Sequence, residues 1–200
     1  MTASPPHGSL RRRSVLSALG VAGLRFLVPA AGTATWARHA AAAEADLTHF
    51  DIARDEDGVY LSFTVNFELG KGPEEALARA VPLFFVAEAE VFRDRWYWRD
   101  RRISHPTRVW KIVYQPLTSN YRVTTVGGLG QTYATREEAL LSLSRATRWK
   151  IAEGNQIDDG RHYVEFDYRL DVTLLPRPMQ IGISGQPDWQ LQVRRTQRIP

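Results

Sequence analysis

The sequence predicts a mainly β protein, either an antiparallel β-sandwich or a partly open barrel, that carries two short helices. Several segments alternate apolar and polar residues with the period of two that a half-buried strand requires. Asp57-Gly58 and Asp159-Gly160 are dipeptides typical of tight hairpin turns. Helical patterns are few and do not alternate with the strands, which argues against a parallel α/β sheet. An α+β sheet with both helices on one face is the alternative.

The strand patterns are clearest at residues 59–67 and 162–174, where every second residue is apolar from Val59 and from Val164 onward. Residues 189–193 repeat the pattern briefly. Each of these segments predicts a strand with one face in a core. Shorter or more fully buried strands are expected at residues 48–53, 81–91, 95–98, 108–114, 121–126 and 179–183. The Asp159-Gly160 turn suggests that residues 149–151 pair with the strand that starts at Arg161.

Two segments carry helix signals. Pro73 stands at a first helical position and is followed by two acids, which complement the helix dipole, so a short helix is expected to continue to Ala80. Thr135 and Glu138 have the spacing of a capping box and precede an apolar stripe. This pattern predicts a second helix that ends at about Thr147.

Residues 1–45 have the order of an export signal: a basic segment, a modest apolar run and an alanine-rich tract before Ala45. Arg12 and Arg13, followed by Ser-Val-Leu, fit the twin-arginine pattern, whereas Arg11 and Arg25 depart from it. The apolar run of about ten residues is too short to span a bilayer. We therefore expect export to the periplasm, no stable membrane anchor after cleavage, and one domain over residues 46–200.

The charge of the chain is concentrated in this first segment. The chain has 26 Lys and Arg against 22 Asp and Glu, and five of the arginines but only one acid lie in residues 1–45. Residues 46–200 therefore hold 21 basic and 21 acidic side chains. The basic balance of the whole chain is no argument for binding nucleic acid, which would require a basic surface on the domain itself.

The most unusual segment, residues 92–102, reads FRDRWYWRDRR. Upstream, odd positions are apolar, but here the even positions Trp96 and Trp98 are, so a bulge near Val91 and Phe92 is expected to switch the inward face. Trp96 and Trp98 would then be core anchors. The opposite face would carry a row of four arginines around a tyrosine: Arg93, Arg95, Tyr97, Arg99 and Arg101.

This row of arginines has two interpretations. Forked guanidinium groups bind carboxylate, phosphate or sulfate, so the row is a candidate site for a small anionic molecule or an acidic protein partner. Alternatively, the arginines pair across the sheet with acids such as Glu165, Asp167 and Asp171 and form an ordinary solvated strand face.

Other motifs predict no catalytic, metal or cofactor site. The chain has no cysteine, and His49, His105 and His162 show no short metal-ligand spacing. No serine lies in a common hydrolase motif. Residues 55–58 lack the full spacing of a calcium loop and indicate a hairpin turn, and residues 127–130 lack a nucleotide-binding pattern and indicate a flexible loop.

Short motifs along the chain resemble a known family. Residues 95–98 (RWYW), 175–180 (LPRPMQ) and Asp188-Trp189 are similar to the exported proteobacterial proteins described as domain of unknown function 4390. The resemblance implies export and a single domain, supplies no catalytic residues, and suggests an accessory role beside a sensor histidine kinase of the nitrogen-regulation type.

The resulting expectation is a non-catalytic binding or accessory domain that contacts an envelope protein or a small anionic ligand. A periplasmic enzyme and a carrier of hydrophobic ligands are the alternatives, because twin-arginine export often serves folded enzymes and a β-sandwich can enclose a cavity.

Overall fold

The computed structural model describes residues 45–183 and 185–200. The export signal expected in residues 1–45, with Arg12 and Arg13, lies outside these residues except for Ala45, which begins the first strand. One compact unit, Arg38–Pro200, holds every described strand and the buried hydrophobic cluster.

The smaller sheet has three antiparallel strands in the order β1-β2-β8. β1 (Ala45–Asp55) and β2 (Gly58–Phe67) form a hairpin, and Asp55 pairs with Gly58 across a two-residue turn, as the Asp57-Gly58 signal predicts. β8 (Arg145–Glu153) adds to the other side of β2. Along β2, the polar residues Tyr60, Ser62, Thr64 and Asn66 alternate with buried apolar residues, so they lie on the outward face of this hairpin.

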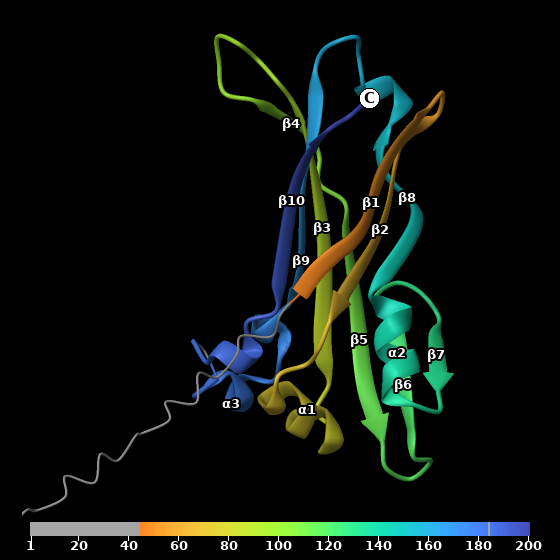
Figure 1. Cartoon of the computed structure of the whole chain (residues 1–200), viewed down its shortest axis with the longest axis vertical. Helices are drawn as coiled ribbons and strands as arrows, with labels where there is room; N and C mark the ends of the chain where they lie inside the picture. The colour runs from red at the N-terminus through yellow and green to blue at the C-terminus, as the bar shows by residue number, and fades with distance from the viewer. Residues whose placement is uncertain (1–44, 184) are drawn as a thin grey trace, which may run out of the picture. The chain divides into compact units, whose positions relative to one another are not determined.

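The larger sheet has seven antiparallel strands. Its main order is β10-β9-β3-β5-β6-β7, and β4 pairs with β3 beyond the start of β5. These strands are β3 (Leu83–Arg93), β4 (Arg101–Ser104), β5 (Thr107–Gln115), β6 (Asn120–Thr125), β7 (Gly130–Tyr133), β9 (His162–Leu170) and β10 (Gln192–Arg198). Figure 1 shows β3 in the middle of this sheet, with β1 and β2 lying in front of it.

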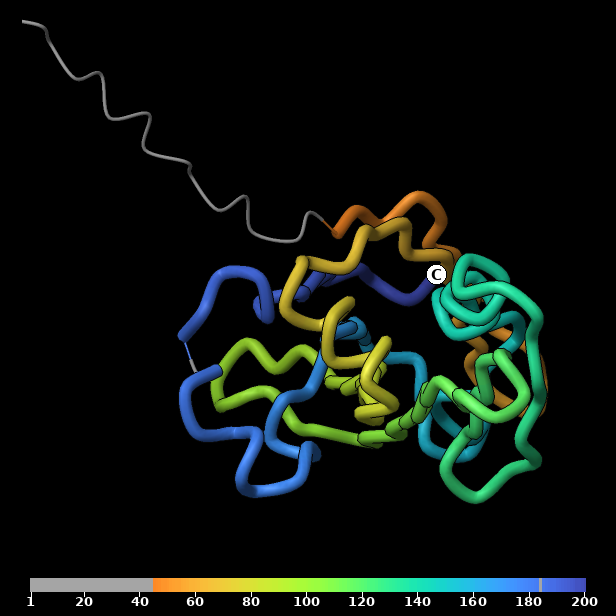
Figure 2. The backbone as a smooth tube through the Cα atoms, turned by 90° about the horizontal axis from the view of Figure 1, so that it is seen from below, coloured from red at the N-terminus to blue at the C-terminus, as the bar shows by residue number. Residues whose placement is uncertain are grey.

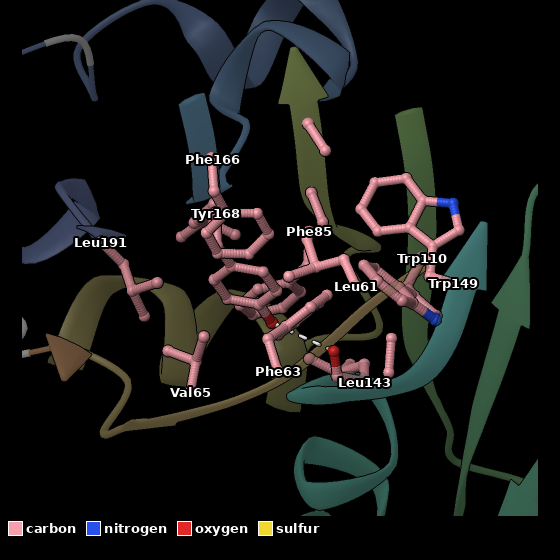
Figure 3. Packing of buried hydrophobic residues seen from close by; sticks show 14 of the residues in the cluster. Leu61, Phe63, Val65, Phe85, Trp110, Leu143, Trp149, Phe166, Tyr168 and Leu191 are labelled. Atoms are coloured by element: carbon pink, nitrogen blue, oxygen red, sulfur yellow. Dashed lines mark hydrogen bonds between the residues drawn. The ribbon is translucent and has the colours of Figure 1, made fainter. Parts of the chain in front are cut away.

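The inner faces of the two sheets share one core, so the fold is an open β-sandwich and not a closed barrel. Phe63 of β2 packs on Phe166 of β9 with ring centroids 4.7 Å apart, and Phe67 stacks on Phe85 at 5.3 Å. Tyr168 is fully buried among these rings, and its hydroxyl donates a hydrogen bond to the carbonyl of Leu143 (Figure 3). The predicted mainly β class and sandwich are confirmed.

Two short helices lie around the lower part of the strands in Figure 1. α1 (Lys71–Ala78) lies across the lower end of the strands (Figure 2) and buries Ala76 and Leu77. The backbone at Gly72 runs so close to the Trp189 indole that a Cβ there would lie 2.4 Å from its Nε1. α2 (Arg136–Leu143) starts at the predicted N-cap, where the Thr135 hydroxyl accepts a hydrogen bond from the Glu138 N–H at 3.2 Å. It ends four residues before the predicted Thr147.

Other boundaries differ from those expected. The segment after β9 leaves the sheet, because the Asp171 carboxylate accepts the Thr173 N–H and starts a short 3₁₀ turn, η2 (Val172–Leu174). The strand expected at residues 179–183 is wrong: residues 179–180 end a third helix, α3 (Arg177–Gln180), and residues 181–183 form a turn. η3 (Pro187–Trp189) displaces the start of the last strand to Gln192. The remaining 3₁₀ turn is η1 (Gly154–Gln156).

β8 and β9 do not pair, so the hairpin expected across Asp159-Gly160 is wrong. β8 pairs with β2 in the smaller sheet, and β9 pairs with β3 and β10 in the larger one. The chain between them, through η1 and residues 157–161, therefore crosses from one sheet to the other. This crossing places residues 158–163 beside the end of β3, where the candidate site lies.

Candidate functional site

The segment that the sequence singled out forms a projecting loop and not a strand. β3 ends at Arg93 and β4 begins at Arg101, and residues 94–100 between them have no regular structure. Figure 1 shows this loop at the upper left, extending clear of both sheets. The strand expected at residues 95–98 is therefore wrong.

The tip of the loop carries three large aromatic side chains in open solvent. Trp96, Tyr97 and Trp98 are 77%, 80% and 79% exposed. The rings of Trp96 and Tyr97 touch edge to face with centroids 4.1 Å apart. The expectation that Trp96 and Trp98 anchor the core is wrong. The core uses Trp110, Trp149 and Trp189 instead, each about 5–6% exposed.

An irregularity does lie where a bulge was expected. The pairing of β3 with β4 changes register between Val91 and Phe92, which face Ser104 and Arg102, so Ile103 is the extra residue. The additional residue thus lies on β4 and not on β3. It does not switch the inward face of β3, because the chain leaves the sheet after Arg93.

The base of the loop is fastened to the start of β9. The Asp94 N–H donates to the Arg161 carbonyl at 2.9 Å. The Asp100 carboxylate accepts one hydrogen bond from the Arg95 N–H at 3.0 Å and another from the Tyr163 hydroxyl at 2.7 Å. The Tyr163 ring also stacks on Phe92, with centroids 5.3 Å apart. We call Asp94, Asp100, Arg161 and Tyr163 the latch.

Two residues of the latch, Asp100 and Tyr163, have shifted pKa values. Hydrogen bonds from Tyr163 and from the Arg95 backbone lower the pKa of Asp100, because both stabilise the ionised carboxylate. Partial burial, together with the bond to Asp100, raises the pKa of Tyr163. At neutral pH the pair is therefore a charged carboxylate held by a neutral phenol.

The candidate arginines fall into two groups. Arg93 forms an ion pair with Asp158, with 2.7 Å between Nη1 and Oδ2. This ion pair lies at the base of the loop, where β3 ends. Arg95, Arg99 and Arg101 are exposed, and no acid of the described residues forms an ion pair with them. Tyr97 lies between Arg95 and Arg99 at the tip.

Two of the acids that could have neutralised the row are engaged by other arginines, whereas the third, Glu165, is exposed and forms no ion pair among the described residues. Asp167 and Asp171 lie around Arg169, which also makes a bidentate pair with Glu88 at 2.7 and 2.9 Å. Arg194 pairs with Asp167 at 2.8 Å. A cross-strand network of the expected kind therefore exists on the larger sheet, but Arg95, Arg99 and Arg101 are not part of it.

His162 is a buried polar residue next to the latch. Its ring is almost fully enclosed, its Nε2 makes no hydrogen bond within the described residues, and the Oδ1 of Asp158 lies 3.5 Å away. Asp158 also accepts the Gly160 N–H at 2.9 Å, and this bond and the nearby Arg93 lower its pKa. His162 and Arg93 therefore both lie beside Asp158 at the base of the loop.

The sequence did not identify the latch residues or Asp158. Tyr163 falls on the outer face of a strand, where a tyrosine carries no special signal, and Asp158 belongs to a turn. Their role depends on the crossing of the chain between the sheets, which brings residues 158–163 to residues 93–100.

The other sequence motifs add no group of metal ligands. Within residues 45–183 and 185–200, no three His, Asp or Glu side chains lie close enough to hold a metal ion. Residues 55–58 form the predicted hairpin turn. The loop expected at residues 127–130 is shorter than predicted, because Gly130 begins β7.

An open pocket of about 580 Å³ lies between the end of β2 and α2. Its lining includes apolar residues that belong to the core or pack against it, among them Val65, Phe67 and Leu140. The lining also includes Arg136 and Glu74, which form an ion pair.

Comparisons with known proteins agree with the resemblance seen in the motifs. No curated protein and no solved structure matched the chain. In the part that the structure describes, no helix has the length and apolar character needed to cross a membrane. A family model described as "domain of unknown function" 4390 matches residues 42–199, which include every described strand. The chain therefore belongs to the family named domain of unknown function 4390.

Proposed function

We propose that this protein is an exported, non-catalytic binding domain whose contact surface is the loop between β3 and β4. The observation that carries the proposal is the loop tip, where Trp96, Tyr97 and Trp98 are all more than three-quarters exposed beside Arg95 and Arg99. Tryptophan, tyrosine and arginine are the residues that dominate binding energy at contact surfaces.

The cost of this arrangement supports a binding role. Large aromatic side chains in water lose the stabilisation that burial would give them, and a fold gains nothing from displaying three in a row. Meanwhile the latch holds both ends of the loop by backbone and side-chain hydrogen bonds. A loop with a fastened base and an unpartnered tip is suited to contact a partner without first becoming ordered.

Export is part of this proposal and is supported by residues 1–45, with Arg12 and Arg13 in the twin-arginine pattern. A partner of this surface would then belong to the cell envelope. The family resemblance suggests a sensor histidine kinase as one protein candidate, and the basic tip would suit an acidic surface.

Photocrosslinking in living cells tests the proposal. A photoreactive phenylalanine in place of Tyr97 should form an adduct in the envelope fraction, and the same residue in place of Leu117 should not. Leu117 is a matched control because it is at least as exposed as Tyr97 and lies on the β5–β6 turn. Changing Arg95, Arg99 and Arg101 to Glu should abolish the Tyr97 adduct without lowering the melting temperature.

Equal adducts at positions 97 and 117, or none at 97, would contradict the proposed contact surface. Recovery of the chain from the cytoplasmic fraction alone would contradict export.

The open pocket beside α2 supports a carrier of hydrophobic ligands less well. Its lining includes Glu68, Glu74, Arg136 and Glu137, so a purely apolar ligand would leave several charged groups next to it.

A further inference from the structure

The chemistry of the loop tip also indicates which class of partner it contacts, and this step rests on the proposed function. Trp96, Tyr97 and Trp98 follow one another directly at the loop tip, all three are exposed, and the rings of Trp96 and Tyr97 touch. Indole and phenol rings have an apolar body and a polar N–H or O–H. Such rings favour the boundary between lipid headgroups and hydrocarbon.

The charge around this cluster is positive. Arg95, Arg99 and Arg101 have no acidic partner among the described residues, whereas both acids of the loop face its base. Asp94 lies 3.5 Å from Arg161, and Asp100 binds Tyr163 and the Arg95 backbone. The latch therefore holds the two carboxylates at the base of the loop, away from the tip. The guanidinium groups of Arg95, Arg99 and Arg101 remain free to bind phosphate.

The geometry favours contact with a lipid surface over contact with a protein. A stable protein interface buries about 800 Å² on each partner and usually has a central anchor within a broad patch. Here the exposed aromatic residues occupy one narrow loop that extends beyond the sheets (Figure 1). Leu117, the most exposed apolar residue described, lies on the β5–β6 turn, away from this loop.

We propose that the β3–β4 loop binds the surface of a bilayer that contains anionic lipids. The aromatic rings of the tip enter the headgroup layer, and Arg95, Arg99 and Arg101 contact lipid phosphates. The rest of the domain stays in water, as expected for a peripheral contact that involves only a few residues.

Vesicle binding tests this inference on residues 38–200, the compact unit that contains all described strands. The unit should sediment with vesicles of phosphatidylcholine and phosphatidylglycerol, and much less with phosphatidylcholine alone. Changing Arg95, Arg99 and Arg101 to Glu should weaken binding about 100-fold or more, since each cationic residue near an anionic surface contributes several-fold. Added salt should weaken the binding of the unchanged protein.

Two control variants separate the loop from general effects of charge and apolarity. Changing Arg145, Arg177 and Arg195 to Glu alters the net charge equally at exposed sites that form no ion pair among the described residues. Leu117→Ser removes an exposed apolar residue elsewhere. Both should bind nearly as the unchanged protein does, whereas Trp96→Ser with Trp98→Ser should weaken binding roughly tenfold or more.

Tryptophan fluorescence reports insertion directly. Trp110, Trp149 and Trp189 are buried, so brominated lipids should quench only Trp96 and Trp98. Inorganic phosphate should cause neither quenching nor a thermal shift, and a thermal shift with phosphate but no vesicle binding would assign the arginines to a soluble anion instead.

The outcomes also separate this inference from the proposed function. The membrane contact would be overturned if the folded protein did not bind vesicles. It would also be overturned if the control variant with Arg145, Arg177 and Arg195 changed to Glu lost as much vesicle binding as the loop variant. If a protein adduct still formed at Tyr97 in cells, the binding role would stand with a protein partner. Failure of both experiments would overturn both proposals.

Discussion

At the scale of single residues, the tryptophans show why the same side chain serves two purposes in this fold. Trp149 is buried between the sheets, where its ring lies 6.4 Å from Phe63 and the Arg108 guanidinium lies over it at 5.2 Å. Among the aromatic rings of the described residues, Trp96 touches only that of the neighbouring Tyr97. Alternation wrongly predicted Trp96 as a core residue, because a seven-residue loop and a strand can have the same pattern of apolar and polar residues.

Alanine substitution should separate these two roles. Trp149→Ala should lower the free energy of unfolding by roughly 3–5 kcal/mol, because it leaves a cavity in the core. Trp96→Ala should change it by no more than about 0.5 kcal/mol, because the ring is in solvent. Urea denaturation followed by circular dichroism measures both. A comparable loss in the two variants would show that the loop packs on the domain.

At the scale of elements, local signals predicted strands whose residues alternate between apolar and polar, and they missed strands that lack this alternation. β8 shows the reason. Arg148 has a positive φ of 46° in the middle of the strand, and its N–H donates to the Ser62 hydroxyl. This bulge changes the parity of the strand, so that Ala146 and Trp149, three residues apart, are both buried. An alternating pattern therefore indicates only residues 149–151.

The latch makes a prediction at the same scale. Tyr163→Phe removes the hydrogen bond that contributes most to the lowered pKa of Asp100, so this pKa should rise toward the ordinary value of about 3.9. Carboxyl chemical shifts followed by NMR over a pH titration measure the change. Tyr114→Phe, on β5 of the same sheet, should leave the Asp100 midpoint unchanged.

The sign of the pH dependence follows from the direction of this shift. Because the pKa of Asp100 is lower in the folded protein than in the unfolded chain, its contribution to stability is complete at neutral pH. It is lost as the pH falls through the folded-state value. The Arg95 amide donates to Asp100, so its protection factor, the ratio of the intrinsic to the observed exchange rate at the same pH, should therefore fall under acidic conditions. Identical Asp100 midpoints in the two proteins would contradict the latch.

At the scale of the whole molecule, the sequence indicated the faces of strands better than their partners. The buried face of β9, from Val164 to Leu170, follows directly from alternation. Its neighbours do not, because the pairing with β3 and β10 depends on contacts distant in sequence. The candidate site shows the same limit. The sequence identified the arginines of the loop, but the latch that displays them requires the crossing of residues 157–161 between the sheets.

The shared core predicts that both sheets unfold together. Phe63 on β2 contacts rings on β9 and β8, so removing it weakens both sides of the sandwich. Native-state hydrogen exchange should show the same opening free energy for the slowest amides of β2 and of β9. Phe63→Ala should lower both values equally, by roughly 3–5 kcal/mol, whereas Leu117→Ala should lower neither. If β2 lost protection while β9 kept it, the three-stranded sheet would be an independent unit, and the aromatic contacts would not couple the two layers.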